Sequence, residues 1–405
     1  MIKVAVLGYG TVGSGVVEVI ESNNAEVSVK AGEEMHVSYI LDLRDFPGDP
    51  YEDRVIHDFN IILNDPEVSV VCEVMGGVGA AYQFTKQLLE AGKSVCTSNK
   101  ELVAKHGAEL LEIARNKNCS YMFEASVGGG IPVIRPITKA LTAEKIEKIT
   151  AILNGTTNYI LSKMEKEGAG YEETLKKAQE LGYAERNPEA DVEGYDACRK
   201  VAILSSLMTG KNVDAEKIYT EGITGISPAD FEYAGAAGMT IKLLATSEAM
   251  ADGRVLAMVA PAFVSTEHPL AAVNDVYNGV FVKGNMLGDV MFYGRGAGKL
   301  PTASAVVSDV IDCARHIGRS SIVCIWDREE AGLADVGESR KCFFVKVKAS
   351  VREKAEEIFQ GCRFVECGRT EDCGLMTAEM SEKEFKEKSG ALGDGILSRI
   401  RIAIV

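Results

Sequence analysis

The sequence lacks the features that mark membrane, secreted and nucleic-acid-binding proteins. No apolar run reaches the ~18 residues of a membrane-spanning helix. The N-terminus, MIKVAVLGYG, begins a strand at once, without a charged region and a long apolar core. Its 44 lysines and arginines are outnumbered by 59 aspartates and glutamates, which gives a formal net charge of −15. We therefore expect a cytoplasmic protein without a nucleic-acid or anionic-membrane surface, since both need clustered basic residues.

Residues that bind transition metals are also sparse. The five histidines form no H-x-x-x-H or H-E-x-x-H pair, and the ten cysteines are scattered without a C-x-x-C pair. We predict no transition-metal site and a reduced, disulfide-free protein. The chain has 405 residues, of which 46% are hydrophobic. This length and composition suffice for two or three domains with sizeable cores.

A glycine motif opens the chain. Residues 2–7, IKVAVL, read as a buried strand, and an apolar helical segment, VVEVIES, follows shortly after. Between them lie Gly8, Gly10 and Gly13 in the pattern G-x-G-x-x-G, with Thr11 and Val12 completing the turn. In this context the glycines permit a tight turn, close approach of a pyrophosphate and close helix–strand packing. The motif predicts dinucleotide binding; the alternative is a simple glycine-rich turn.

A second strand, MHVSYILDLR, ends at Asp42 and Arg44. An acid at this place usually binds the ribose 2′-OH of NAD, whereas an arginine can hold the 2′-phosphate of NADP. Both residues are present, so the preference between NAD and NADP stays open. The strand comes later than the usual ~20 residues after the motif, which predicts a longer first helix or loop.

Further strands at 67–77 (EVSVVCEVMGG) and 94–100 (SVCTSNK) enclose a helix, AAYQFTKQLLEAG. This alternation predicts a parallel, doubly wound sheet. Ligands bind such sheets at the carboxyl ends of the strands, where Thr97, Ser98, Asn99 and Lys100 fall. Lys100 is thus either a site residue or a solvated loop lysine.

The segment from Gly182 to Lys200, GYAERNPEADVEGYDACRK, gathers several charged groups. Pro188 predicts a non-helical stretch from Tyr183 to Glu189, with Glu185 on it, and a helix afterwards. Asp191 should lie near the start of that helix, and Asp196 and Lys200 should share one face. The apolar run VAILSSLM follows directly and should be buried, so this pair should lie at the edge of a buried region. The pKa values of acidic and basic groups shift easily in such a place. The alternative is an acidic loop with one ordinary salt bridge.

The run from Ala178 to Lys200, A-x-x-x-G-Y-A-x-x-N-P-x-x-D-V-x-G-x-D-x-x-x-K, resembles the homoserine dehydrogenase signature, and ILNGTTNYI and T-S-N-K resemble two further family segments. The resemblance implies reduction of L-aspartate 4-semialdehyde to L-homoserine with NAD or NADP, on the branch to threonine, methionine and isoleucine. It implies that Lys200 is the proton donor, with Lys100 second and Asp196 orienting. Glu185 and Asp191 would bind the substrate ammonium, and Lys100 would contact both substrate and nicotinamide, beside Ser98.

Two glycine-rich segments complete the predicted site. YMFEASVGGGIPVIRP, at 121–136, is either a hinge or a cation loop. In the family it binds a monovalent cation (Na or K), and the matching positions here are Glu124, Val127, Gly129 and Ile131. YGRGAGKLPTASAVVSDVIDCARHIG, at 293–318, has glycines before a long helix. The resemblance implies that this loop, with Gly296, closes over the cofactor and that the helix returns to the nucleotide domain.

We predict an α/β protein of three domains. Residues 1–135, completed by 301–335, form a Rossmann-type nucleotide-binding domain. Residues 136–300 form a mixed α+β catalytic and dimerisation domain, and the family is expected to be a homodimer or homotetramer. Residues 340–405 alternate as β-α-β-β-α-β, the order of a ferredoxin-like fold, and resemble an ACT regulatory domain. The usual acid-x-Pro-Gly turn is replaced by KASV at 348–351, which leaves open effector binding or a role in assembly alone.

Two other functions compete with this interpretation. One is a different nicotinamide-dependent amino-acid dehydrogenase, including one with an acyl-enzyme intermediate. That version needs an activated cysteine near the cofactor, but Cys72 and Cys96 lie in apolar strands. The other is a non-catalytic NAD(P)-responsive regulator, which would bind the cofactor without turnover; the complete charged motif at 182–200 disfavours it.

Overall fold

The computed structural model describes residues 1–322 and 324–403, so residue 323 and the last two residues of the predicted C-terminal strand and domain lie outside the described residues. The chain forms two compact units. Unit 1 comprises Met1–Glu144, Ala202–Ala215 and Gly294–Ala331, and unit 2 comprises Lys145–Val201, Glu216–Tyr293 and Gly332–Val405. No helix among the described residues is both long and apolar enough to cross a membrane.

Unit 1 contains a six-stranded parallel sheet in the order β3-β2-β1-β4-β5-β6. Its strands are β1 (Ile2–Leu7), β2 (Met35–Leu41), β3 (Val55–Ile56), β4 (Val68–Glu73), β5 (Ser94–Thr97) and β6 (Tyr121–Met122). The strand order reverses between β1 and β4, which is where doubly wound sheets bind ligands. The predicted Rossmann-type sheet is confirmed.

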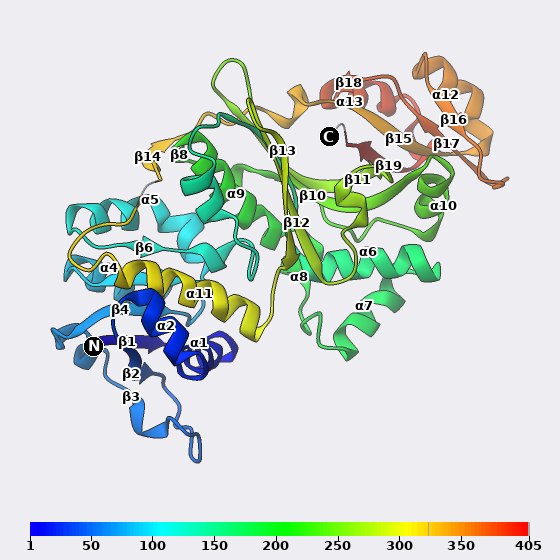
Figure 1. The fold of residues 1–405 in the computed structure, drawn as a ribbon. Helices are drawn as coiled ribbons and strands as arrows, with labels where there is room; N and C mark the ends of the chain where they lie inside the picture. The colour runs from blue at the N-terminus through cyan, green and yellow to red at the C-terminus, as the bar shows by residue number, and fades with distance from the viewer. Residues whose placement is uncertain (323, 404–405) are drawn as a thin grey trace. The chain divides into compact units, whose positions relative to one another are not determined.

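The helices of unit 1 include the extra length predicted after the first strand, in two pieces. They are α1 (Thr11–Ser22), α2 (Asn24–Ala31), α3 (Phe59–Asn64), α4 (Gly79–Glu90), α5 (Lys100–Asn116) and α11 (Lys299–Ala314). Figure 1 shows α11, far along the chain, lying beside α1. A methyl group added to Gly15 would lie 3.0 Å from Ala303 Cβ, so glycine permits this close packing. The apolar face of α11, with Val306, Val310 and Cys313, joins the core of the sheet.

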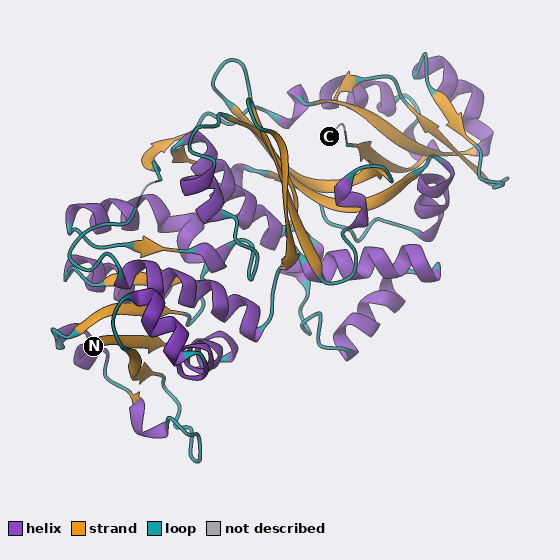
Figure 2. Ribbon diagram, in the orientation of Figure 1, coloured by secondary structure: helices purple, strands orange, loops and turns teal. Residues whose placement is uncertain are grey.

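Unit 2 is built on an 11-stranded sheet with the main order β13-β12-β7-β10-β11-β19-β15-β17-β16, to which β9 and β18 add. Its first half has β7 (Ile146–Ile152), β9 (Tyr219–Thr220), β10 (Met239–Ala249), β11 (Val255–Ser265), β12 (Tyr277–Gly284) and β13 (Gly288–Arg295). Helices α6 (Gly155–Glu167), α7 (Tyr171–Glu180), α8 (Glu189–Val192) and α10 (Pro228–Ala236) accompany it. Figure 2 shows α6 running beside these strands, and it contacts β10 and β12.

The C-terminal segment has the predicted β-α-β-β-α-β order. It consists of β15 (Arg340–Lys348), α12 (Arg352–Ile358), β16 (Arg363–Val365), β17 (Asp372–Met376), the short β18 (Met380–Ser381), α13 (Glu382–Gly390) and β19 (Ile396–Ile402). The strand order β19-β15-β17-β16 is that of a ferredoxin-like sheet. The segment has its own apolar cluster around Phe343, Phe359 and Leu375. Its strand β19 also pairs with β11 in parallel, so the two halves of unit 2 share one sheet.

Unit 1 also contains a two-stranded sheet, in which β14 (Asp327–Glu330) pairs with β8 (Lys211–Asn212). One local feature differs from the expectations. We predicted one helix carrying Asp191, Asp196 and Lys200. The chain instead forms α8 and a separate α9 (Tyr195–Thr209), because Gly194 between them has φ +84°, a left-handed conformation that interrupts a helix.

Candidate functional site

The nucleotide-binding motif of unit 1 adopts the geometry that its glycines predict. Gly8 has φ +93°, and a methyl group added to it would lie 2.9 Å from Met75 Cα. A methyl group on Gly13 would overlap the carbonyl oxygen of Gly8, whereas one on Gly10 would meet nothing within 4 Å. Gly8 and Gly13 are thus required by the protein itself, while Gly10 faces open space, where a pyrophosphate could approach.

Helix α1 begins at Thr11, and Val12 and Gly13 follow in its first turn. No side chain caps this end. Its first backbone amides therefore have no side-chain partner and can donate hydrogen bonds to an anionic group, as in other dinucleotide-binding folds. The five motif residues thus have the strand–turn–helix arrangement that binds the pyrophosphate of a dinucleotide in other proteins of this fold.

Asp42 and Arg44, at the end of β2, contact one another. Asp42 Oδ2 accepts a hydrogen bond from the Tyr9 amide at 2.8 Å, which ties it to the glycine loop. Its Oδ1 accepts from Arg44 Nε at 3.0 Å, and its Oδ2 accepts from Arg44 Nη2 at 3.1 Å. The Arg44 guanidinium holds the pKa of Asp42 well below its usual range. The Arg44 side chain is 62% exposed, so an anchored carboxylate and an accessible cation lie together.

The predicted TSNK segment begins at Thr97, the last residue of β5. Ser98 and Lys100 are half-buried, and Lys100 is the first residue of α5. Asn99 caps this helix, because its side chain accepts a hydrogen bond from the Leu102 amide at 3.1 Å. The cap places Lys100 at the carboxyl end of the parallel sheet of unit 1, as expected.

The predicted cation segment is fixed by Glu124, which is 3% exposed. Its carboxylate accepts hydrogen bonds from the amides of Val133, Ile134 and Arg135 at 2.6, 2.8 and 2.7 Å. Its own amide donates to Asp309 Oδ2 at 2.9 Å, which links the segment to α11. The carboxylate is therefore engaged by backbone amides, so a cation role for Glu124 would have to use its carbonyl oxygen.

The other three residues of this segment are also buried. Gly129 has φ +57°, and a methyl group added to it would overlap the carbonyl of Gly296. Val127 and Ile131 are 0% and 2% exposed. The triple-glycine segment thus packs directly against the second glycine loop. Among the described residues, no group of three or more histidine, cysteine and acidic side chains is placed to hold a metal ion.

In unit 2, Asp196 and Lys200 form the predicted pair on α9. Lys200 Nζ donates hydrogen bonds to Asp196 Oδ2 and to the carbonyl oxygen of Leu153, both at 2.8 Å. The two residues are only 5% and 9% exposed. The carbonyl comes from the end of β7, so two elements far apart in sequence fix one ammonium group.

Asn154 joins the second acidic residue to this pair. Its Nδ2 donates to Asp191 Oδ1 at 2.7 Å and to Asp196 Oδ2 at 2.9 Å. Its Oδ1 accepts from the Thr157 amide at 2.8 Å and thereby caps α6. Burial, with the nearby charge of Asp196, raises the pKa of Asp191. We call Asn154, Asp191, Asp196 and Lys200 the acid–base cluster.

Glu185 lies outside the hydrogen bonds of this cluster. Its side chain is exposed on the loop before α8, and its backbone carbonyl accepts from Gln179 Nε2 at 3.0 Å. The loop is non-helical from Tyr183 to Pro188, as predicted, although Glu189 already begins α8. The role of Glu185 in substrate binding stays a prediction.

Sequence reasoning missed two groups, one that holds Lys200 and one buried acid of unit 1. The Leu153 carbonyl has no side-chain signature that could have revealed it. Glu73 could have been noticed, because it is the one acid within the apolar run VSVVCEVM; it is fully buried at the end of β4.

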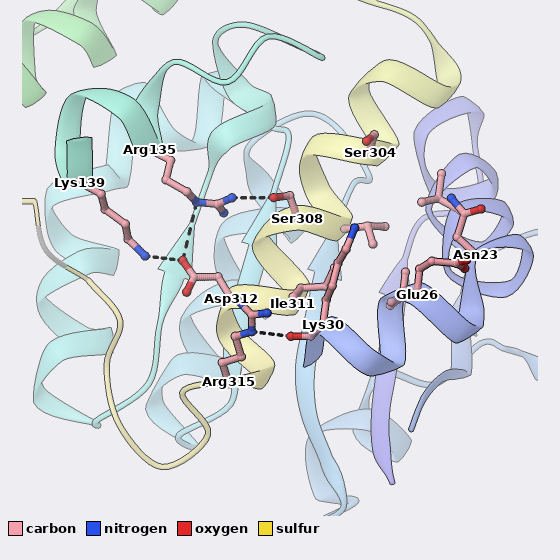
Figure 3. Close-up of a pocket in the computed structure, with 13 residues that line it drawn as sticks. Asn23, Glu26, Lys30, Arg135, Lys139, Ser304, Ser308, Ile311, Asp312 and Arg315 are labelled. Atoms are coloured by element: carbon pink, nitrogen blue, oxygen red, sulfur yellow. Dashed lines mark hydrogen bonds and ion pairs between the residues drawn. The ribbon is translucent and has the colours of Figure 1, made fainter. Parts of the chain in front are cut away.

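A large pocket of unit 1 shares no residue with the predicted site. This groove has a volume of about 770 Å³. Its lining residues lie over the outer face of α11, between α1–α2 and residues 135–139 (Figure 3). Arg135 Nη1 donates to Ser308 Oγ at 2.6 Å, and Lys139 Nζ lies 2.5 Å from Asp312 Oδ2. These side chains pair with one another, so the groove by itself shows no chemical site.

Two family models match the sequence. The model described as "Homoserine dehydrogenase, NAD binding domain" matches residues 8–124, and the model described as "Homoserine dehydrogenase" matches residues 132–311. A homoserine dehydrogenase of Synechocystis sp. is 45% identical over 317 residues, which are 77% of this chain and 73% of that protein. The nucleotide motif and the acid–base cluster lie within the two matched regions.

Solved structures agree with these matches. A homoserine dehydrogenase from Thiobacillus denitrificans has a TM-score of 0.90 and 32% identity, covering 99% of this chain and 98% of that one. A hyperthermophilic archaeal homoserine dehydrogenase in complex with NADPH has a TM-score of 0.64 and 27% identity, covering 77% and 97%. The resemblance seen at residues 178–200 is confirmed, and this chain belongs to the homoserine dehydrogenase family.

Proposed function

We propose that this chain reduces L-aspartate 4-semialdehyde to L-homoserine with NADH or NADPH, and catalyses the reverse reaction. The observation that carries this proposal is the buried pair of Lys200 and Asp196, together with the Asn154 bridge to Asp191. The bound nicotinamide supplies the hydride that reaches the aldehyde carbon. The chain must then supply a proton to the oxygen of that carbon.

Lys200 is suited to this proton transfer. An ammonium group has three hydrogens, and within the described residues two of them go to Asp196 Oδ2 and the Leu153 carbonyl. The third remains for a substrate oxygen. Asp196 orients the lysine, and a positioned acid of this kind contributes about 10²–10⁴-fold to the rate. In the reverse direction the same amine accepts the proton of the homoserine hydroxyl.

The substrate ammonium is proposed to bind the acidic side of the cluster. Asp191 is partly exposed, and Asn154 bridges it to Asp196. The two nearby carboxylates repel one another, and a cation bound beside Asp191 would be attracted to both. Glu185, on the exposed loop before α8, is proposed to close on the same ammonium. Lys100 and Ser98 are proposed to act from unit 1, at the nicotinamide end of the nucleotide.

A monovalent cation is proposed at the carbonyl oxygens of Glu124, Val127, Gly129 and Ile131. The burial of this segment and its packing against Gly296 support the proposal, because a cation there would fix the glycine loop of α11. Sodium or potassium chloride should then raise turnover above that in a tetramethylammonium salt of equal ionic strength. Equal turnover in all three salts would contradict it.

The C-terminal segment is proposed to be an ACT-like module that serves assembly in a cytoplasmic homodimer. Residues Ala349–Val351 form a short 3-10 helix where the usual acid-x-Pro-Gly turn would stand. Arg399 and Arg401 of β19 pair with Glu382 of α13 and also with Glu221, which follows β9. The pairs with Glu221 hold β19 against the first half of unit 2. Light scattering of the whole chain should give twice the mass of one chain; a monomer would contradict this proposal.

The enzymatic proposal is tested by absorbance at 340 nm with L-homoserine and either NAD or NADP. We expect homoserine-dependent formation of the reduced nucleotide. Folded protein that binds a nucleotide but reduces none with homoserine would contradict the proposal and favour a regulator.

A further inference from the structure

Glu73, the last residue of β4, has no role in the chemistry above. Its side chain is 0% exposed. Its Oε1 accepts a hydrogen bond from the Met75 amide at 3.0 Å, and its Oε2 accepts one from the Thr97 hydroxyl at 2.7 Å. Burial raises the pKa of this carboxyl, whereas these hydrogen bonds lower it. A buried acid bonded to a neutral hydroxyl and a neutral amide is costly for a protein core, so its position calls for an explanation.

The Thr97 hydroxyl extends the contact in a fixed direction. Its oxygen accepts from the Asn99 amide at 2.9 Å, so its hydrogen points to Glu73. Asn99 in turn donates from Nδ2 to the Gly77 carbonyl at 2.6 Å and caps α5 through Oδ1. Helix α5 begins at Lys100. We call Glu73, Thr97 and Asn99 the relay.

The relay also reaches the nucleotide motif. Glu73 fixes the Met75 amide, and Met75 Cα is the atom that a methyl group on Gly8 would meet at 2.9 Å. The neighbouring Val74 amide donates to the Leu7 carbonyl at 3.0 Å, at the end of β1. The loops after β1, β4 and β5 are therefore held in one arrangement around a single buried carboxylate.

We propose that Glu73 is a positioning residue, which acts through Thr97 and Asn99 to set Lys100 and the nucleotide-binding loops in their working geometry. This inference rests on the proposed function, since it assigns Lys100 and these loops to the reaction. Glu73 is proposed to touch neither the substrate nor the cofactor. A displacement of about 1 Å at a reacting group can cost about 10²-fold in rate, so loss of the relay should be seen in turnover.

Glutamine removes one of the two acceptor oxygens that Glu73 uses in the relay. Its amide has one oxygen, so either the Met75 amide or the Thr97 hydroxyl would face an NH₂ group. Thr97→Val breaks the relay at its next member with almost unchanged volume, and Thr97→Ser keeps the hydroxyl. Thr85 offers a matched control, because it is also fully buried in unit 1 and its hydroxyl oxygen has no hydrogen-bond partner in the described residues.

The test compares kcat, KM and the NADPH dissociation constant for the wild type, E73Q, T97V, T97S and T85V. We expect E73Q and T97V each to lower kcat about 10- to 100-fold, and T97S to recover most of the loss seen in T97V. The double variant E73Q/T97V should be no slower than the slower single variant, because both remove one relay. T85V should keep the wild-type kcat.

Hydrogen exchange separates this inference from the proposed function. E73Q should increase deuterium uptake at 75–77 and 97–102 and weaken NADPH binding, whereas T85V should change neither. If the wild type lacks activity with homoserine, the proposed function fails. Hydrogen exchange and NADPH affinity still test the positioning role of Glu73, because neither measurement needs turnover. E73Q and T97V could instead lower thermal stability while kcat, NADPH affinity and hydrogen exchange of the loops stay as in the wild type. That result would show a purely structural role for Glu73 and overturn the inference.

Discussion

Lys200 Nζ lies 2.8 Å from Asp196 Oδ2 on the same helix and 2.8 Å from the carbonyl oxygen of Leu153 at the end of β7. The lysine is therefore held by two acceptors from separate elements, in a buried place. A solvent-exposed i,i+4 pair has neither feature and contributes only about 0.3–0.5 kcal/mol. This geometry favours a catalytic role for Lys200 over an ordinary surface salt bridge.

Asn154→Asp should lower kcat/KM for homoserine about 10- to 100-fold, the effect of losing one charge-assisted hydrogen bond. The new carboxylate can still cap α6 by accepting from the Thr157 amide, but it cannot donate to Asp191 and Asp196. Steady-state kinetics and thermal unfolding check this. N158D is the contrast, because Asn158 Nδ2 donates to the carbonyls of Val273, Asp275 and Tyr277. We expect N158D mainly to lose stability. The opposite result, in which N154D mainly loses stability and N158D mainly loses kcat/KM, would contradict the roles assigned to the two asparagines.

Gly13→Ala and Gly10→Ala should have different effects. A methyl group on Gly13 would overlap the Gly8 carbonyl, so G13A should lower both the melting temperature and nucleotide affinity. A methyl group on Gly10 has open space around it in the protein. G10A should therefore keep the melting temperature and lose nucleotide affinity at least tenfold, if a pyrophosphate occupies that space. Calorimetry with NADPH and thermal unfolding measure both; unchanged affinity in G10A would place the pyrophosphate elsewhere.

Arg44→Ala should reduce kcat/KM for NADP about tenfold and for NAD much less. The guanidinium is exposed and held in place by Asp42, so it can contact a 2′-phosphate. A charge-assisted hydrogen bond is worth about 1.5–3 kcal/mol, which sets the expected magnitude. NAD serves as the internal control, since it lacks the phosphate. An equal loss with both nucleotides would show that Arg44 acts only through Asp42.

Lys242 should make stability depend on pH in the alkaline range. Its side chain is fully buried in β10 and donates to the Val273 carbonyl at 2.8 Å and to Asn274 Oδ1 at 2.9 Å. Burial lowers the pKa of Lys242 from 10.5 to about 8. Between these values the unfolded chain binds more protons than the folded chain, so the free energy of unfolding rises with pH.

The increase in the free energy of unfolding that is due to Lys242 should reach at most about 3 kcal/mol between pH 8 and 10.5. Urea unfolding of the wild type and Lys242→Met across this range measures it. The wild type should gain stability relative to K242M as the pH rises. A constant difference between the two proteins would show that the lysine has an ordinary pKa.

The sequence predicted the parts of the structure that depend on local pattern. The strand–turn–helix at Gly8–Gly13 follows from apolar residues and glycines within one short stretch. The Asp196–Lys200 pair follows from helical spacing. The sheet of unit 1 follows from the alternation of strands and helices.

Contacts between distant residues could not be predicted in this way. Asn154 lies 37 and 42 residues from the two aspartates that it bridges, and only the folded unit brings them together. The Glu73–Thr97 bond depends on β4 and β5 being neighbours. The helix break at Gly194 was missed because a glycine inside a helical pattern is tolerated in many helices, and its left-handed backbone is known only from the fold.

The catalytic role of Lys200 is tested by the turnover of L-homoserine by Lys200→Ala, with nucleotide affinity measured on the same sample. Lys163→Ala is the matched control, because Lys163 forms an i,i+4 pair with Glu167, at 3.4 Å, on α6 of the same unit. We predict that K200A loses at least about 10²-fold in kcat and binds the nucleotide within a few-fold of wild type, while K163A keeps the wild-type kcat. Wild-type turnover in K200A would remove Lys200 from the mechanism and contradict the proton transfer proposed for it.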